Sequence, residues 1–373
     1  MVDFDEFLVI DSKLLQKLNE SLDEILEQKQ NFYISSFLEK GLGRMVKNTR
    51  RIQGKKISVI TPMKKEEMIK ITLDFFKSID SEFYKKAINT ILQQSENIKM
   101  NIYNVHRVKD FEKIDEMGLV LYKSGGAVQN KNGFARVNVP TRTELYSNEE
   151  KILDKDECSL EDLYILVHEI SHLFDLNLER DKPDKEELSG GREKVGWSGT
   201  RELLVEATSI AFEGMLSDYL LNNTSISKAA IQEAINFTTN SYLRDARLVC
   251  AKLLLAREKH NNGEIDLEVI ENFMRDNNFS KKYMREIVKD IVEDTDEMYN
   301  EKRYAIGQLI APTIIKKYKE EGSITLKKYL QEVKNGNFKG ALNAIGIELN
   351  EQGINKLVCN TKEYVSKSDI KER

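Results

Sequence analysis

The stretch LYILVHEISHL, residues 163–173, places two histidines inside an apolar segment. His168 and His172 are four residues apart, so in a helix their imidazoles lie one turn apart on the same face and can bind one metal ion. The flanking Leu, Tyr, Ile and Val residues indicate that this helix is buried. Because burying two imidazoles without partners is costly, the pattern favours a metal site over two ordinary histidines on a helix.

The glutamate that follows the first histidine completes a chemical pattern. Glu169 lies where a carboxylate can act as general base on an attacking water, and zinc held by the two histidines would acidify that water. The chain has only four histidines, so a chance match is expected on the order of a few times in a thousand chains of this size. We therefore predict zinc bound by His168 and His172, with Glu169 as a catalytic residue.

A second apolar helix, predicted from about residue 201 to 221, offers a third ligand. Catalytic zinc sites have three protein ligands and leave the fourth position to water. Glu206 and Glu213 fall on one face of this helix, and glutamates in an apolar helix are rarely left without a partner. We predict that Glu206 binds zinc and that Glu213 supports a ligand histidine. Glu202 is the main rival ligand, and two surface glutamates are the alternative interpretation.

Capping and composition signals delimit these helices. Ser159 and Asp162 predict a capping box at the start of the histidine helix. The polar, Gly-rich connection 182–200 is expected to form an active-site flap. Beyond it the chain is predicted to be helical almost to its end, with Pro312 kinking one helix.

The first 140 residues are predicted to contain helices and one hairpin. Residues 10–105 show apolar positions at helical spacing and predict several amphipathic helices. The basic stretch 44–56 is predicted to be a solvated loop between them. Residues 117–139 are predicted as a β-hairpin with strands at 117–122 and 134–139, turns at 124–126 and 130–133, and an end at Pro140. Its edge could pair with an extended peptide, and a purely structural hairpin is the alternative. The expected fold class is mainly α, with this small β-hairpin or sheet beside the zinc helix.

Composition excludes several classes of protein. The chain is 40% hydrophobic and 32% charged, with a formal net charge of −5, which argues against a dedicated binder of nucleic acid or anionic membranes. Three scattered cysteines give no disulfide framework. The sequence shows neither a signal peptide nor a run of roughly 18 apolar residues. A cytoplasmic protein with no nucleic-acid or membrane partner is therefore expected.

The motifs together resemble the thimet oligopeptidase and oligoendopeptidase F family of zinc peptidases. That family follows its zinc helix with Glu-x-Pro-Ser-x-x-x-Glu, which residues 206–213 match except for the proline. Its first glutamate is a zinc ligand, which supports Glu206. The segments KSGGA at 123–127 and RYAIG at 303–307 are similar to the family's Lys-x-x-Gly-Ala and Lys-Tyr-Ala-Thr-Gly. The resemblance covers about residues 118–350.

The resemblance implies further roles and a domain division. It makes Tyr304 the candidate donor to the oxyanion, with Tyr299 as a weaker candidate and a core tyrosine as the alternative. The family's histidine near this position is missing, so its role is either absent or taken by His260. Residues 1–115 are expected to form an N-terminal helical region, a reduced cap, and residues 116–373 a zincin-like catalytic domain.

These observations predict a zinc metalloendopeptidase that cleaves oligopeptides or flexible protein segments. One alternative is a narrowly specific zincin, a toxin or effector that cuts a single protein. Another is a non-catalytic helical binding protein that retains zinc. Cleavage preference and oligomeric state are left open by the sequence.

Overall fold

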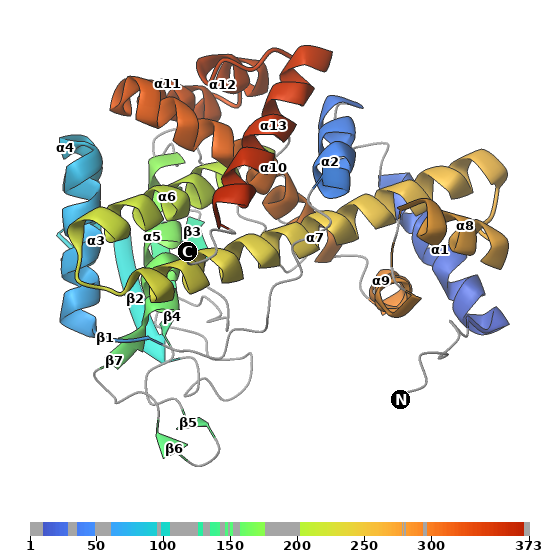
Figure 1. The fold of residues 1–373 in the computed structure, drawn as a ribbon, viewed down its shortest axis with the longest axis horizontal. Helices are drawn as coiled ribbons and strands as arrows, with labels where there is room; N and C mark the ends of the chain where they lie inside the picture. The colour runs from blue at the N-terminus through green and yellow to red at the C-terminus, as the bar shows by residue number, and fades with distance from the viewer. Residues whose placement is uncertain are drawn as a thin grey trace.

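The chain adopts a mainly helical fold in which small sheets lie beside the central helices, as seen in the computed structural model (Figure 1). This confirms the predicted fold class. The structure describes residues 10–28, 36–48, 61–94, 98–104, 126–129, 135–141, 146–147, 150–151, 157–175, 202–277, 279, 281–293 and 297–368.

The helices and strands have the following bounds. The helices are α1 Ser12–Gln28, α2 Ser36–Asn48, α3 Lys65–Ile79, α4 Ser81–Ile91, α5 Leu160–Asp175, α6 Glu202–Asn223, α7 Lys228–Asn262, α8 Leu267–Asn277, α9 Lys281–Glu293, α10 Glu297–Glu321, α11 Ser323–Lys334, α12 Phe338–Ala344 and α13 Glu351–Ser368. The strands are β1 Pro62–Lys64, β2 Ile98–Asn104, β3 Gly126–Gln129, β4 Ala135–Thr141, β5 Tyr146–Ser147, β6 Glu150–Lys151 and β7 Glu157–Ser159.

Helix α5 begins at the predicted capping box. The backbone N–H of Ser159 donates to Asp162 Oδ2 over 2.7 Å, and that of Asp162 donates to Ser159 Oγ over 3.2 Å. This reciprocal pair satisfies two N–H groups that the first turn leaves without helical partners. The start of the histidine helix is therefore fixed by a local sequence signal, as predicted.

Helix α6 lies in the core and packs closely against α10. Every described side chain from Leu204 to Ser217 is buried, which is typical of a helix that is covered all round. Gly307 of α10 makes the close approach possible, because a Cβ there would lie 3.0 Å from the carbonyl carbon of Glu206 and 3.1 Å from the nitrogen of Ala207. The helix that carries Glu206 is thus held against α10 at backbone contact distance.

The three-stranded sheet packs against α5 and has the order β2-β4-β3. β4 is parallel to β2, with Ile98 opposite Ala135, and antiparallel to β3, with Gly126 opposite Asn138. β4 confirms the second predicted strand of the hairpin, whereas the first, residues 117–122, lies outside the described part of the chain. Its partner β3 lies instead at Gly126–Gln129, from the last residue of the first predicted turn up to the second turn. The prediction that the strand stops at Pro140 is wrong.

Pro140 pairs with Tyr103 because β4 gains a parallel neighbour from a distant segment. A further prediction for the first half of the chain also needs correction. Residues 10–105 are not all helical, since they include β1 and β2. The alternation of Ile98, Met100 and Ile102 is a period-two signal that the helical interpretation passed over.

The basic stretch 44–56 is not all loop. Arg44 and the residues up to Asn48 belong to α2, and the Arg44 guanidinium donates to Asn355 Oδ1 over 2.6 Å and pairs with Glu351. Residues 49–60 lie outside the described part of the chain, as does the expected flap at 182–200.

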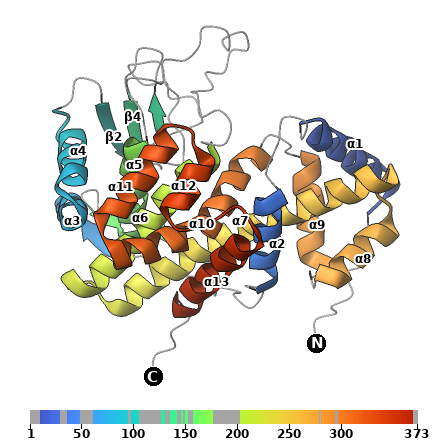
Figure 2. The same cartoon turned by 90° about the horizontal axis from the view of Figure 1, so that it is seen from above.

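Two buried apolar clusters share α7, which runs along the molecule in both ribbon views (Figures 1 and 2). The larger cluster contains side chains from each of the helices α2 through α6, from α10, α11 and α13, and from part of α7. The smaller one joins α1, α8 and α9 to the C-terminal part of α7. The division into domains at residue 115 stays a prediction.

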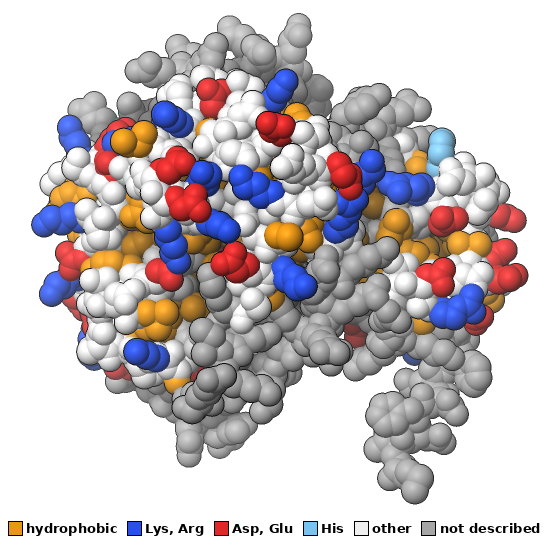
Figure 3. Space-filling model, turned by 45° about the horizontal axis from the view of Figure 1, so that its top comes forward, with side chains coloured by type: hydrophobic (Ala, Val, Ile, Leu, Met, Phe, Trp, Pro, Cys, Tyr) orange, Lys and Arg blue, Asp and Glu red, His pale blue; other side chains and the backbone are white. Residues whose placement is uncertain are grey.

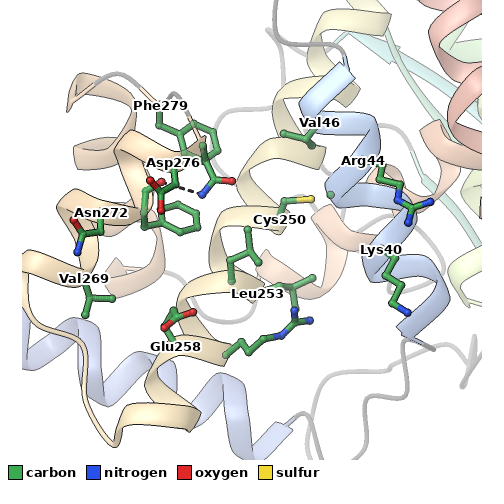
Figure 4. A pocket seen from close by; sticks show the side chains of 15 residues that line it. Lys40, Arg44, Val46, Cys250, Leu253, Glu258, Val269, Asn272, Asp276 and Phe279 are labelled. Carbon is green, nitrogen blue, oxygen red and sulfur yellow. Dashed lines mark hydrogen bonds between the residues drawn. The ribbon is translucent and has the colours of Figure 1, made fainter. Parts of the chain in front are cut away.

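A cavity of about 500 Å³ lies between α2, α7 and α8 (Figure 4). Apolar side chains such as Val46 and Leu253 line it together with Lys40, Glu258 and Asp276. Because the lining mixes apolar side chains with charged groups of both signs, it indicates no particular ligand.

Charged side chains of both signs are interspersed over the face shown in Figure 3. Among the described residues, no helix combines the length and the apolar character needed to cross a bilayer.

Candidate metal centre

Three side chains from α5 and α6 meet in the core. His168 Nε2 lies 3.2 Å from His172 Nε2 and 3.2 Å from Glu206 Oε2, and the distance from His172 Nε2 to Glu206 Oε2 is 3.8 Å. The residues are only 7%, 8% and 2% exposed, respectively. This buried cluster could hold a metal ion.

The donor atoms fit a divalent metal in both spacing and chemistry. Zinc binds imidazole nitrogen and carboxylate oxygen at about 2.0–2.2 Å, so neighbouring ligand atoms of a tetrahedral site lie about 3.3 Å apart. Glu206 Oε2 is buried and has no hydrogen-bond partner among the described residues. A buried carboxylate oxygen without a partner is costly, and a cation between the three atoms would compensate it.

The two histidines differ in how α6 contacts them. His168 Nδ1 lies 2.5 Å from Glu213 Oε1, whereas Ser209 Oγ lies 3.1 Å from His172 Nδ1 and 3.3 Å from His172 Nε2, in line with neither nitrogen. Tyr242 of α7 donates its hydroxyl to the same Glu213 oxygen over 2.7 Å. The Glu213 contact orients His168 so that its Nε2 faces His172 and Glu206, as carboxylates that hydrogen-bond metal-binding histidines usually do.

Helix α10 adds a cation and an aromatic ring. Arg303 Nε lies 3.2 Å from Glu206 Oε1, and its guanidinium carbon lies 5.3 Å from the centre of the Tyr304 ring. The Tyr304 ring stacks between Tyr242, at 6.0 Å and 11°, and His168, at 6.5 Å and 29°. Tyr304 therefore lies directly beside the histidine pair.

The carboxyl groups of Glu169 and Glu206 have opposite pKa shifts. Burial raises the pKa of Glu169 to about 8, although the neighbouring His168 opposes this effect. Burial also acts to raise the pKa of Glu206, but His172, His168 and Arg303 outweigh it and bring that pKa to about 2. Glu206 is thus a carboxylate at neutral pH, whereas Glu169 can take up a proton there.

The two histidines also differ. Burial lowers the pKa of His172 to about 3, so its imidazole is neutral, as a metal ligand must be. Burial acts in the same direction on His168, but the adjacent Glu206 and Glu213 raise its pKa well above the ordinary value. Burial together with the charge of Glu213 raises the pKa of Tyr242, which therefore stays a hydrogen-bond donor.

The structure gathers the predicted site residues in one place, and their roles stay predictions. Glu213 contacts a histidine, as the predicted support requires. Glu202 is the first residue of α6, and Tyr299 lies near the start of α10. The side chains of both residues are outside the described part of the chain. His260 is exposed in the last turn of α7, 18 residues after Tyr242, or about 27 Å along the helix. It cannot take the oxyanion role, and His106 lies outside the described residues.

Sequence reasoning missed three residues of the site. Ser209 had a signal, because it lies on the same face of α6 as Glu206 and Glu213. Arg303 stood next to a predicted site residue but was assigned no role. Tyr242 lies in the middle of the 35-residue helix α7, and only the tertiary packing reveals its contact with Glu213.

Comparison with known proteins supports the fold. No family model matches the chain, and no curated protein matches it. A solved structure described as a "putative peptidase" from Chlamydophila abortus is similar, with a TM-score of 0.53 at 13% sequence identity. The match covers 96% of this chain and 56% of that one, so this chain spans little more than half the length of its structural neighbour. At this identity the likeness shows the fold.

Proposed function

We propose that this protein is a zinc metallopeptidase that hydrolyses peptide bonds in oligopeptides or flexible protein segments. The observation that carries the proposal is the buried convergence of His168, His172 and Glu206, with Glu169 beside the first histidine. Zinc peptidases of this kind bind the metal through two imidazoles and one carboxylate. They use a second carboxylate, which is not a metal ligand, as the general base. The likeness to a chain described as a peptidase agrees with this proposal.

Glu169 would move the protons of the reaction. Zinc held by the two histidines and Glu206 would supply Lewis acidity to the attacking water and to the scissile carbonyl. Glu169 Oε2 is buried without a hydrogen-bond partner among the described residues, so it can accept a proton from that water. Glu169 would then donate that proton to the leaving amine nitrogen.

Tyr304 would donate a hydrogen bond to the oxygen that becomes negative in the transition state. Its ring stacks on His168, which places it beside the reacting groups. The charge of Glu206, together with burial, raises the pKa of Tyr304, so the hydroxyl keeps its proton. A fixed phenolic donor of this kind is worth most in a site that excludes water.

The sheet beside α5 would hold the substrate. β3 lies at one edge of the three-stranded sheet and packs against α5. An extended peptide can add to such an edge through main-chain hydrogen bonds, which would bring its backbone next to the histidine helix. The motif at residues 206–213 supports membership of the thimet oligopeptidase and oligoendopeptidase F family, as a short divergent member.

A digest of a mixed peptide library, read by mass spectrometry, tests the proposal. The unchanged chain should cleave peptides, a chelator should stop cleavage, and added Zn²⁺ should restore it. Glu169→Gln should still bind Zn²⁺ while cleavage falls by about 10²- to 10⁴-fold, the usual contribution of a general base. Cleavage that survives both the chelator and this substitution would rule out the mechanism. Zinc binding without cleavage of any short peptide would favour the alternative of a narrowly specific enzyme that cleaves a single protein.

A further inference from the structure

The two oxygens of Glu206 face different partners. Oε2 points at the histidine nitrogens, at 3.2 and 3.8 Å, and Oε1 lies 3.2 Å from Arg303 Nε. The Glu206 side chain is only 2% exposed, so water has little access to either oxygen. One carboxylate therefore connects the candidate metal position on α5 to a cation on α10.

A carboxylate ligand can bind a metal through one oxygen or through both. A second bound oxygen would raise the coordination number of a site built for four ligands, one of them water. The contact between Arg303 Nε and Glu206 Oε1 is an ion pair rather than an aligned hydrogen bond. The guanidinium charge beside Oε1 competes electrostatically with the metal for that oxygen, which leaves Oε2 to face the metal.

We propose that Arg303 is a positioning residue that holds Glu206 as a one-oxygen metal ligand. This inference rests on the proposed function, because it assumes that the His168, His172 and Glu206 cluster binds a metal.

The surroundings of Arg303 support a fixed geometry. Its guanidinium lies over the Tyr304 ring, and its side chain is 25% exposed. One helical turn later, Gly307 packs on the backbone at Glu206 and Ala207, which sets the distance between α10 and α6. Arg303 is therefore held at its base by close helix packing and near its tip by an aromatic face.

Whether removal of Arg303 strengthens or weakens metal binding distinguishes a positioning role from simple charge repulsion. An arginine near a cation site repels the bound metal, so its removal should tighten metal binding if repulsion were its main effect. If Arg303 instead positions Glu206, its removal should weaken binding, because the ligand loses its orientation. Groups that orient metal ligands usually contribute about 10- to 100-fold in affinity.

The chain offers a matched control on the same two helices. Lys319 of α10 pairs with Asp218 of α6 over 2.6 Å, and both side chains are about half exposed. Lys319→Met removes an α10–α6 ion pair, as Arg303→Met does, but 16 residues further along α10. Arg303→Lys is a second variant, which keeps the charge and loses the planar guanidinium.

The experiment measures Zn²⁺ affinity of the full chain by competition with a chromophoric chelator, together with the visible spectrum of the Co²⁺-loaded protein. Arg303→Met should weaken Zn²⁺ binding by about 10- to 100-fold and shift the Co²⁺ spectrum from four-coordinate towards higher coordination. Arg303→Lys should lie between this variant and the unchanged chain, and Lys319→Met should match the unchanged chain.

Each other result overturns the inference in a recognisable way. Equal or tighter Zn²⁺ binding by Arg303→Met, with an unchanged Co²⁺ spectrum, removes the positioning role and leaves the proposed function intact. A similar loss in Lys319→Met would show that the effect belongs to helix packing. If Arg303→Met does not fold, Arg303→Lys decides, and an unchanged affinity and spectrum in that variant overturn the role. Failure of the unchanged chain to bind Zn²⁺ overturns the proposed function and this inference together.

Discussion

At the scale of single residues, the site depends on how each buried polar atom is satisfied. Glu213 receives contacts from His168 and Tyr242 on the same oxygen, whereas Glu169 Oε2 and Glu206 Oε2 have no hydrogen-bond partner among the described residues. Groups left unsatisfied in a core destabilise the fold and usually mark a function. The metal centre is thus recognised by unpaired acceptors as much as by the histidines.

The Tyr242 hydroxyl should matter for metal binding. Tyr242→Phe removes the donor to Glu213 and loosens the orientation of His168, so Zn²⁺ affinity should fall by roughly 10-fold. The free energy of unfolding of the metal-free chain should fall by about 1 kcal/mol. Tyr164→Phe is the control, because the buried Tyr164 hydroxyl hydrogen-bonds Ser217 at 2.9 Å and, among the described residues, neither Glu213 nor a histidine. The Tyr164→Phe variant should lose a similar free energy of unfolding while its Zn²⁺ affinity stays unchanged. An equal loss of Zn²⁺ affinity in both variants would count against the orienting role of Tyr242.

The pKa of Glu169 predicts a pH-dependent destabilisation of the metal-free chain. Its folded pKa of about 8 lies above the ordinary 4.5, so the folded state holds a proton that the unfolded state releases. The resulting stability is fully present below pH 4.5 and is lost as the pH rises towards 8. Glu169→Gln should therefore be more stable than the unchanged chain at pH 8, by on the order of 4 kcal/mol. Urea denaturation of both chelator-treated proteins at pH 5 and pH 8 measures this gap, and a gap that does not widen with pH would contradict the assignment.

At the scale of elements, the site depends on four helices. α5 supplies the histidines, α6 supplies Glu206, Ser209 and Glu213, α7 supplies Tyr242, and α10 supplies Arg303 and Tyr304. The contact of α10 with α6 needs a residue without a side chain at position 307.

A methyl group at position 307 should separate α10 from α6. In Gly307→Ala the new Cβ would meet backbone atoms of Glu206 and Ala207 at 3.0 and 3.1 Å, which cannot rotate away. The free energy of unfolding should fall by roughly 1–3 kcal/mol, as in other overpacked cores, and peptidase activity should fall with it. Gly43→Ala in α2 is the control, because its Cβ would meet nothing within 4 Å and a helical alanine is favoured by roughly 0.5–1 kcal/mol. Equal stability of the two variants in urea would show that the close approach is not required.

At the scale of the whole molecule, local signals predicted more than long-range ones. The capping box at Ser159 and the histidine pair lie within one helix, so spacing alone located them. Arg303 and Tyr242 reach the site from distant parts of the chain, and no local pattern specifies such packing. β2 was missed because its partner β4 is parallel and remote in sequence, although its alternating residues carried a strand signal. The flap at 182–200 and residues 117–125 lie outside the described residues and stay predictions.

The most direct test of the account is the zinc content of the purified full chain, measured by inductively coupled plasma mass spectrometry after dialysis. The account predicts about one Zn²⁺ per chain and near-complete loss in His172→Ala, because only two ligands would remain. Lys319→Met should keep its metal. Absence of metal from the unchanged chain after dialysis against added Zn²⁺, or full retention in His172→Ala, would contradict the metal centre and the peptidase built on it.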